Sequence, residues 1–324
     1  MRRRDFITLV GGTAATWPTV ARAQEAGRKY RIAALLPGPR NQPNYVGLFD
    51  ELQQFGFIEG QNLMIDVRSY GEHIELLSKY AEELFATPAN VIIAAGDLAI
   101  RAAQQATKTI PILAFTDDMV GSGFVSSLAK PGGNTTGVSF LTTELDGKRQ
   151  EILIEAVPGL RHMAALADTN TTAPRQLEAL QDAAHTRGIE LSIHRVIKAD
   201  EIAPAIDAAK KLEVGALNVL ASPLLFANRQ LIIERTAALR LPAIYQWPEM
   251  AEEGGFLAYG PRLVPLYRDI MARQLVKLLR GIKPANLPVE QPTKFEFVIN
   301  MKTANTLGLP VSRSMQLLAD EVIE

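Results

Sequence analysis

The chain has 324 residues, no cysteine and a formal net charge of −1 at pH 7. The lack of cysteine excludes disulfides, thiolate metal sites and a lipid anchor on an N-terminal cysteine. A nearly neutral charge without a block of Lys and Arg argues against nucleic-acid binding, which needs a basic patch to neutralise phosphates. Chains of about 300 residues usually divide into two domains.

Residues 1–23 are predicted to be a removable export signal. Arginines at positions 2–4 precede an uncharged segment, residues 6–20, and residues 21–23 have the small-x-small pattern of a cleavage site. The uncharged segment is shorter than the roughly twenty apolar residues that span a bilayer. The string RRDFI resembles a twin-arginine signal, with general secretion as the alternative. We therefore expect a periplasmic protein without a lipid anchor.

Short β-branched runs alternate with amphipathic stretches in two successive series, which is typical of βαβ units. In the first series we expect strands at residues 31–36, 63–67, 91–95 and 110–115, and helices near residues 45–55, 73–85 and 98–106. In the second series we expect strands at residues 163–167, 191–196, 216–220 and 243–245, and helices near residues 174–187, 200–211 and 225–240. The pattern predicts an α/β fold with two Rossmann-like, doubly wound parallel-sheet domains.

The chain is expected to cross between these domains more than once. A turn cluster at residues 130–134 and an extended run at 135–140 precede a helix that begins near Thr143, and we place the first crossing there. A long amphipathic helix after residues 256–259 is not needed by the second sheet, so it is expected to return to the first domain. A single linker is the alternative. The expected lobes are residues 28–138 with 258–288, and residues 139–257 with 289–324.

Candidate site residues follow from one rule: in open parallel sheets, ligands bind beyond the carboxyl ends of the strands. In the first domain the rule selects Pro37, Gly38, Asn44, Gly96, Asp97 and Asp118. In the second domain it selects Asn170, Ser222, Tyr245 and Trp247. Asp97, Asp118 and Ser222 each have a simpler alternative as a helix cap, since Asp and Ser are preferred caps. Trp247 has the alternative of core packing. As a set from both domains, these residues predict a shared cleft.

Asp97 is the most specific of these candidates. It is expected to face the cleft as an ionised carboxylate at a helix N-terminus, where the helix dipole favours negative charge. It would then bind a cationic or hydrogen-bond-donating group of the ligand. A ligand carboxylate is expected on the opposite domain, at Ser222, Asn170 or main-chain amides.

Motifs of α/β enzymes are missing where such enzymes carry them. The chain has no G-x-G-x-x-G after the first strand, no G-x-x-x-x-G-K-[ST] and no G-x-S-x-G. The four histidines have no metal-ligand spacing. We therefore expect no catalytic residue, no metal and no cofactor.

Four long strings resemble one known family, and they lie at residues 52–66 (LQQFGFIEGQNLMID), 109–140, 241–261 and 287–309. They are similar to the periplasmic substrate-binding proteins of ABC transporters, in the family whose best-known members bind aromatic amino acids such as tryptophan. The resemblance implies a type I periplasmic-binding fold with several hinge crossings. It also implies that a small polar or amphipathic ligand, an amino acid or related metabolite, is clasped between the lobes and passed to an ABC permease of the inner membrane.

The sequence departs from the family at its binding loops. The loop after the third strand, G-T-P-A-A-like in the family, reads Gly96-Asp97-Leu98-Ala99 here. An Asp at that helix N-terminus would repel a ligand carboxylate placed there. The family's D-P-V becomes Asp118-Met119-Val120, and its N-P turn becomes Asp168-Thr169-Asn170. The resemblance thus implies the transport role and leaves the ligand open.

Three other functions remain as alternatives to solute capture by a monomer. A sensor that docks to a membrane receptor would share this sequence pattern. A secreted α/β enzyme lacks the motifs named above. A repressor with the same core would need a DNA-binding module at the N-terminus, where this chain has the predicted export signal.

Overall fold

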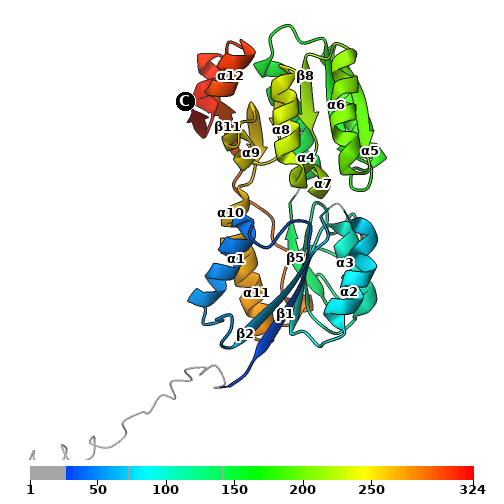
Figure 1. Ribbon diagram of the computed structural model, residues 1–324, viewed down its shortest axis with the longest axis vertical. Helices are drawn as coiled ribbons and strands as arrows, with labels where there is room; N and C mark the ends of the chain where they lie inside the picture. The colour runs from blue at the N-terminus through cyan, green and yellow to red at the C-terminus, as the bar shows by residue number, and fades with distance from the viewer. Residues whose placement is uncertain (1–26, 72, 141) are drawn as a thin grey trace, which may run out of the picture.

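The computed structural model describes residues 27–71, 73–140 and 142–324, and they form two α/β lobes stacked end to end (Figure 1). The expected export signal, with its twin-arginine string, lies outside the described residues. Within the described ranges, no helix combines the length and the apolar character needed to cross a membrane.

The first lobe contains a five-stranded parallel sheet in the order β2-β1-β3-β4-β5. Its strands are β1 (Tyr30–Leu36), β2 (Leu63–Ser69), β3 (Val91–Ala95), β4 (Ile112–Thr116) and β5 (Thr135–Ser139). Its helices include α1 (Pro43–Gln54), η1 (Ile74–Leu76), α2 (Leu77–Phe85) and α3 (Asp97–Ala106). Alternate side chains of β1 pack on opposite faces, with Ile32 and Ala34 in the core under α1 and Ala33 and Leu35 in the core under α2 and α3.

The second lobe contains a seven-stranded sheet in the order β12-β11-β10-β9-β8-β6-β7, in which only β10 and β11 pair antiparallel among the described strands. Its strands are β6 (His162–Asp168), β7 (Glu190–Val196), β8 (Ala216–Val219), β9 (Ala243–Tyr245), β10 (Leu257–Gly260), β11 (Glu296–Asn300) and β12 (Glu321–Ile323). Its helices are α4 (Thr142–Ala156), α5 (Pro174–Thr186), η2 (Ala199–Glu201), α6 (Ile202–Lys211), α7 (Pro223–Ala227), α8 (Arg229–Ala238), α9 (Pro248–Glu252), α12 (Met301–Leu307) and α13 (Arg313–Leu318). Two parallel-sheet lobes confirm the predicted α/β class.

The prediction of a single helix near residues 225–240 is wrong. The structure has two helices there, α7 and α8, which are separated at Asn228. Ser222 caps α7 by accepting a hydrogen bond from the Leu225 amide, and Asn228 donates from its side chain to the Leu224 carbonyl, at 3.2 and 3.0 Å. Short polar side chains bonded to local backbone in this way favour helix ends over helix interiors.

Three segments connect the lobes within the described chain, and they lie between β5 and α4, between β10 and α10, and between η4 and β11. The second crossing returns the chain to the first lobe, where α10 (Leu263–Pro265), the π-helical turn η3 (Leu266–Met271) and α11 (Ala272–Leu279) pack against α1 before η4 (Pro284–Asn286). Residues 258–260, which the sequence analysis assigned to the first lobe, instead belong to β10 of the second sheet. The return therefore begins after Gly260.

The first and third crossings run side by side. Ser139 of β5 donates its amide to the Glu290 carbonyl at 3.0 Å, and the Glu290 amide donates to Gly137 at 2.9 Å. Glu290 thus extends the first-lobe sheet by a short bridge next to β5.

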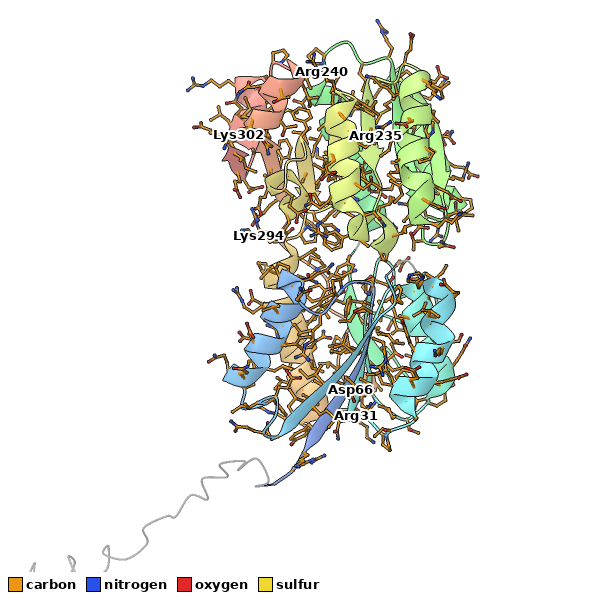
Figure 2. All side chains as sticks on the ribbon, in the orientation of Figure 1. Arg31, Asp66, Arg235, Arg240, Lys294 and Lys302 are labelled. Atoms are coloured by element: carbon orange, nitrogen blue, oxygen red, sulfur yellow. The ribbon has the colours of Figure 1, made fainter. Side chains whose placement is uncertain are left out.

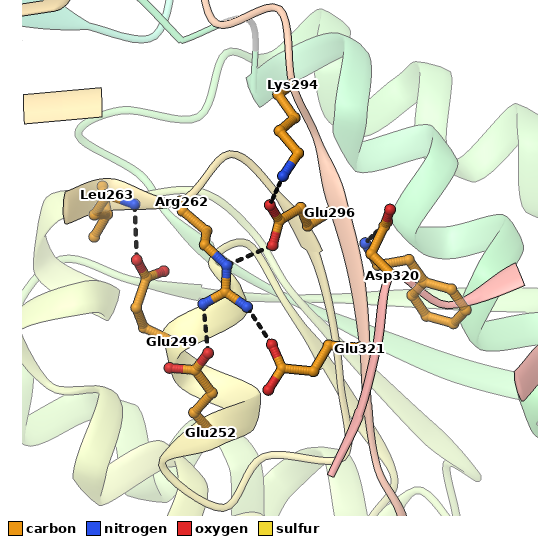
Figure 3. Close-up of polar contacts among 9 residues, drawn as sticks. Glu249, Glu252, Arg262, Leu263, Lys294, Glu296, Asp320 and Glu321 are labelled. Carbon is orange, nitrogen blue, oxygen red and sulfur yellow. Dashed lines mark hydrogen bonds and ion pairs between the residues drawn. The ribbon is translucent and has the colours of Figure 1, made fainter. Parts of the chain in front are cut away.

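Arg262 joins the second and third crossings on the second-lobe side. Its guanidinium binds Glu252 of α9, Glu296 of β11 and Glu321 of β12, and Lys294 binds the other oxygen of Glu296 (Figure 3). Lys294 lies near the junction of the lobes, whereas the Arg31–Asp66 pair, 2.6 Å apart, lies at the distant end of the first lobe (Figure 2). The cluster around Arg262 fixes where two of the crossings leave the second lobe.

Glu249 lies beside this cluster and has an incompletely bonded carboxyl group. Its Oε1 accepts a hydrogen bond from the Leu263 amide at 2.8 Å, whereas its Oε2 is buried without a partner among the described residues. Burial raises the pKa of the Glu249 carboxyl above its ordinary value. A raised pKa stabilises the fold through the protonated form, and this contribution is lost as the pH rises through the folded-state pKa.

Glu249→Gln should therefore raise the free energy of unfolding at pH 7, because glutamine mimics the protonated acid. Near pH 4, where an unperturbed glutamate with a pKa of about 4.3 is mostly protonated, the two proteins should be equally stable. Urea denaturation at both pH values measures the difference. A variant less stable than wild type at pH 7 would contradict this account.

Candidate ligand-binding site

A cavity of about 220 Å³ lies between the two lobes, at the carboxyl ends of strands from both sheets. Its first-lobe wall follows β1, β3 and β4, and its second-lobe wall follows β8 and β9 and includes the start of α5. This position is the one that the strand-end rule predicts.

Seven of the ten expected site residues line the cavity: Pro37, Asn44, Gly96, Asp97, Asp118, Ser222 and Trp247. The other three, Gly38, Asn170 and Tyr245, are not among the lining residues. The expectation for Tyr245 is wrong because this residue is still within β9 and faces the helix layer. Its hydroxyl is 2.9 Å from Thr236 Oγ1 of α8, and its side chain is buried.

Gly38 and Asn170 make hydrogen bonds outside the cavity. The Gly38 carbonyl accepts a hydrogen bond from Ser69 Oγ at 2.8 Å. Asn170 is exposed and donates from its side chain to the Ile197 carbonyl at 3.2 Å, outside the cavity. Asn170 is therefore badly placed to hold a ligand carboxylate.

Asp97 is the first residue of α3, and its side-chain hydrogen bonds go to β4 and the following loop rather than to its own helix. Its Oδ1 accepts from the Thr116 hydroxyl, and its Oδ2 accepts from Ser122 Oγ at 2.8 Å. Thr116 is the last residue of β4, and Ser122 lies in the loop that follows this strand. The alternative in which Asp97 only caps α3 therefore does not describe this geometry, and the carboxylate is held at the cavity wall by two donors.

Gly96 allows the lobes to approach each other closely. Its φ of +82° lies in the region that favours glycine. A Cβ at this position would be 2.9 Å from the Tyr70 hydroxyl and 3.5 Å from Pro223 Cγ of the second lobe. The first-lobe wall thus meets the second lobe almost directly at this point.

Ser222 and Asp118 both make side-chain hydrogen bonds within the protein. Ser222 Oγ donates to Asp168 Oδ2 at 2.7 Å while it caps α7, and Asp168 is itself buried. Asp118 Oδ1 accepts from the Gly121 amide at 2.7 Å and so closes its own loop. Ser222 therefore both caps α7 and lines the cavity. Because its hydroxyl proton is donated to Asp168, it has none to donate to a ligand.

An aromatic strip crosses the cavity from one lobe to the other. Its rings are each edge-on to the next, with centroids 5.1 to 6.4 Å apart, and in order they are Tyr45, Tyr267, Phe115, Phe140, Trp247 and Phe226. Edge-to-face contact is the favoured geometry for such rings. The sequence analysis found only Trp247, because Tyr267 arrives by the second crossing and Phe140 lies on the first.

At the first-lobe end of the strip, the phenols stay neutral. Burial raises the pKa of both Tyr45 and Tyr267 well above the ordinary value, and hydrogen bonding to the Asn44 side chain only partly opposes this. The strip therefore offers an apolar surface with a few neutral polar groups at that end.

The two walls of the cavity carry opposite charge. The first-lobe wall has three carboxylates, at Asp97, Asp117 and Asp118. The second-lobe wall has Arg175, on the first turn of α5, as the one cationic side chain among the described lining residues. Arg175 is exposed, and within the described chain its guanidinium has no ion pair or hydrogen bond. No sequence pattern pointed to Arg175, since it lies past a turn rather than directly after a strand.

A buried ion pair supports the second-lobe wall from behind. Gln176, which lines the cavity, donates to Asp146, and Asp146 pairs with Arg149. Arg149 in turn donates to the Tyr259 carbonyl at 3.0 Å. Asp146 thus connects α4, α5 and, through Arg149, β10 beneath the site.

Among the described residues, no three His, Asp or Glu side chains are grouped so that they could hold a metal ion.

The sequence profile of the ABC transporter substrate-binding proteins matches residues 29–323. The chain belongs to this family. Membership confirms the resemblance found in the four strings and gives the chain its general role, the binding of a substrate for an ABC transporter. Proteins of this family act outside the cytoplasm.

Relatives of this substrate-binding protein cover most of its length. A tyrosine-binding protein of Clostridioides difficile (strain R20291) is 24% identical over 285 residues, 86% of this chain and 80% of the relative. An ABC domain from Streptococcus pneumoniae, solved in complex with L-Trp, is 24% identical, covers 91% of this chain and 100% of its own, and superposes with a TM-score of 0.81. A ligand-free, open substrate-binding protein with adhesive properties from Clostridium difficile is 22% identical over 91% of this chain and 99% of its own, with a TM-score of 0.62. These likenesses confirm the type I periplasmic-binding fold.

Proposed function

We propose that this chain captures a small zwitterion with an aromatic or other apolar body, such as an amino acid, for an ABC importer. The arrangement of the cavity supports this proposal: an acidic wall faces a wall with an unpaired arginine, and an aromatic strip runs across both. A volume of about 220 Å³ suits one small metabolite, since drug-sized ligands occupy pockets of about 300–1,000 Å³.

The charges suggest one orientation of the ligand. Its ammonium group would lie against Asp97, where the helix dipole stabilises the carboxylate and where a ligand carboxylate would be repelled. Its carboxylate would lie against Arg175, because a guanidinium and a carboxylate form strong charge-assisted hydrogen bonds. Arg175 replaces Ser222 and Asn170 in this role, since the first has its hydrogen bonds satisfied and the second points away.

The relatives support an aromatic ligand. One is named as a tyrosine-binding protein, and another was solved with L-Trp. Binding would close the lobes about the three crossings, and the closed form would dock to a permease in the inner membrane. In this role the chain acts as a monomer without catalytic activity, and a sensor that docks to a receptor is the second candidate.

Thermal-shift screening of the full chain against amino acids, aromatic acids and small uncharged apolar compounds tests this function. A ligand present at one hundred times its dissociation constant should stabilise the folded state by about 2.7 kcal/mol. We expect zwitterions with apolar bodies to raise the unfolding temperature, and small apolar compounds without charge to leave it unchanged. Stabilisation by neither class would contradict the proposed ligand.

We also propose a periplasmic location reached by the twin-arginine route, because Arg3 and Arg4 precede the apolar segment and only Asp5 separates them from it. Changing both residues to lysine should then stop accumulation in the periplasm, as measured by cell fractionation. Normal accumulation of this variant would point to general secretion.

A further inference from the structure

Gln246 lines the cavity with an amide group that no described residue satisfies. The residue is 1% exposed, and neither Oε1 nor Nε2 has a hydrogen-bond partner in the part of the chain that the structure describes. Buried polar atoms are nearly always paired in folded proteins, and an unpaired one costs stability. An amide with both ends free therefore needs an explanation outside the chain's own hydrogen bonds.

The fold holds the backbone of Gln246 without using its side chain. A Cβ on Gly260 would lie 2.0 Å from the Gln246 carbonyl oxygen, so the two strand ends are packed backbone against backbone. On either side, Tyr245 is bonded to Thr236, and Trp247 is edge-on to Phe140 and Phe226. The position is thus fixed by its neighbours, while the amide is left to contact whatever fills the cavity.

The amide belongs to the apolar part of the second-lobe wall. It follows β9, directly before the Trp247 ring, whereas Arg175 belongs to the helix that follows β6. In the sheet order β9-β8-β6, these two strands are two spacings apart, about 10 Å. A ligand whose carboxylate reaches Arg175 would therefore present its opposite, apolar end toward Gln246.

We propose that Gln246 selects ligands whose apolar end carries a neutral group able both to donate and to accept a hydrogen bond, as a hydroxyl or a carboxamide does. This inference rests on the proposed function. Oε1 requires a donor and Nε2 requires an acceptor, so a plain hydrocarbon ring leaves both unpaired. A charged group is disfavoured there, since a charge buried beside Gln246 would lack a counter-ion.

Two pairs of probes that differ by one hydroxyl test the inference: L-tyrosine against L-phenylalanine, and 4-hydroxybenzoate against benzoate. Isothermal titration of the full chain should show the hydroxylated member of each pair binding at least about tenfold more tightly, because a site built for a hydroxyl rejects the analogue without it. In Gln246→Met, which keeps the length of the side chain and removes both polar atoms, this ratio should fall to about one. The fall should come from weaker binding of the hydroxylated probes.

Gln274→Met is the matched control. Gln274 is also buried with an unpaired Oε1, but it lies on α11 and does not line the cavity. The control should keep the wild-type preference. Gln246→Leu provides a second variant if the methionine variant fails to fold, with circular dichroism as the test of folding.

The outcomes separate this inference from the function on which it rests. If wild type binds the members of each pair equally, or if the preference survives in the Gln246 variants, the role of Gln246 is overturned and solute capture stands. If the folded wild-type chain binds none of the four probes, the aromatic ligand class fails, and the inference fails with it.

Discussion

Asp97→Asn should weaken binding of the ligand by about 2 kcal/mol, roughly thirtyfold, while the free energy of unfolding changes by less than about 1 kcal/mol. The substitution keeps the shape of the side chain and removes the charge that would pair with a ligand ammonium group. The two hydroxyls that now donate to Asp97, on Thr116 and Ser122, can reorient toward an amide. Stability should therefore change little.

Asp200→Asn is the control for this experiment. Asp200 also lies at the start of a helical segment, but it is exposed, pairs with Lys198 and lies outside the cavity. Calorimetric titration of both variants against the same ligand should separate a local effect from a general loss of negative charge. Equal affinity of wild type and Asp97→Asn would remove the carboxylate from ligand recognition.

Arg175→Gln should weaken binding of a ligand carboxylate by about 2 kcal/mol, because a charge-assisted hydrogen bond is lost. Stability should stay within about 0.5 kcal/mol of wild type, since Arg175 is exposed and has no partner in the described chain. L-tyrosine and tyramine, which lacks the carboxylate, give a direct comparison. Wild type should prefer L-tyrosine strongly, and Arg175→Gln should lose most of that preference.

Arg187→Gln serves as the control for Arg175, because Arg187 immediately follows the same helix but pairs with the exposed Glu151. It should discriminate between the two compounds as wild type does. A preference for L-tyrosine that survives in Arg175→Gln would place the carboxylate elsewhere in the cavity.

The sheets and the cleft could be predicted because they depend on local patterns. β3 and most of β1, residues 32–36, are continuous apolar runs between turn signals. The strand-end rule then leads to Asp97 and Trp247 without a three-dimensional structure. The same rule was wrong for Tyr245, since the strand includes that residue and its side chain faces α8. An error of one residue along a strand reverses the face to which a side chain points.

Other parts of the site depend on contacts between distant segments, which a single sequence does not reveal. Tyr267 reaches the aromatic strip because the chain returns to the first lobe at the second crossing, and the segment from α10 through α11 packs there. Arg175 and Gln246 stand out only because they lack partners among the described residues. That lack becomes visible only when the positions of all neighbouring side chains are known. The boundary at Gly260 likewise depends on the pairing of β10 with β9 and β11.

Trp247 gives the most direct test of the central claim, that this chain binds a small zwitterion between its lobes. The sequence has two tryptophans, Trp17 and Trp247, so Trp17→Phe leaves a full chain whose single tryptophan lines the cavity. Titration with the ligand that most raises the unfolding temperature should change the emission of Trp247 in a saturable way, with one site per chain. The change should be lost when Asp97→Asn and Arg175→Gln are combined. A compound that stabilises the protein without altering Trp247 emission, or that binds the double variant as tightly as wild type, would contradict the account.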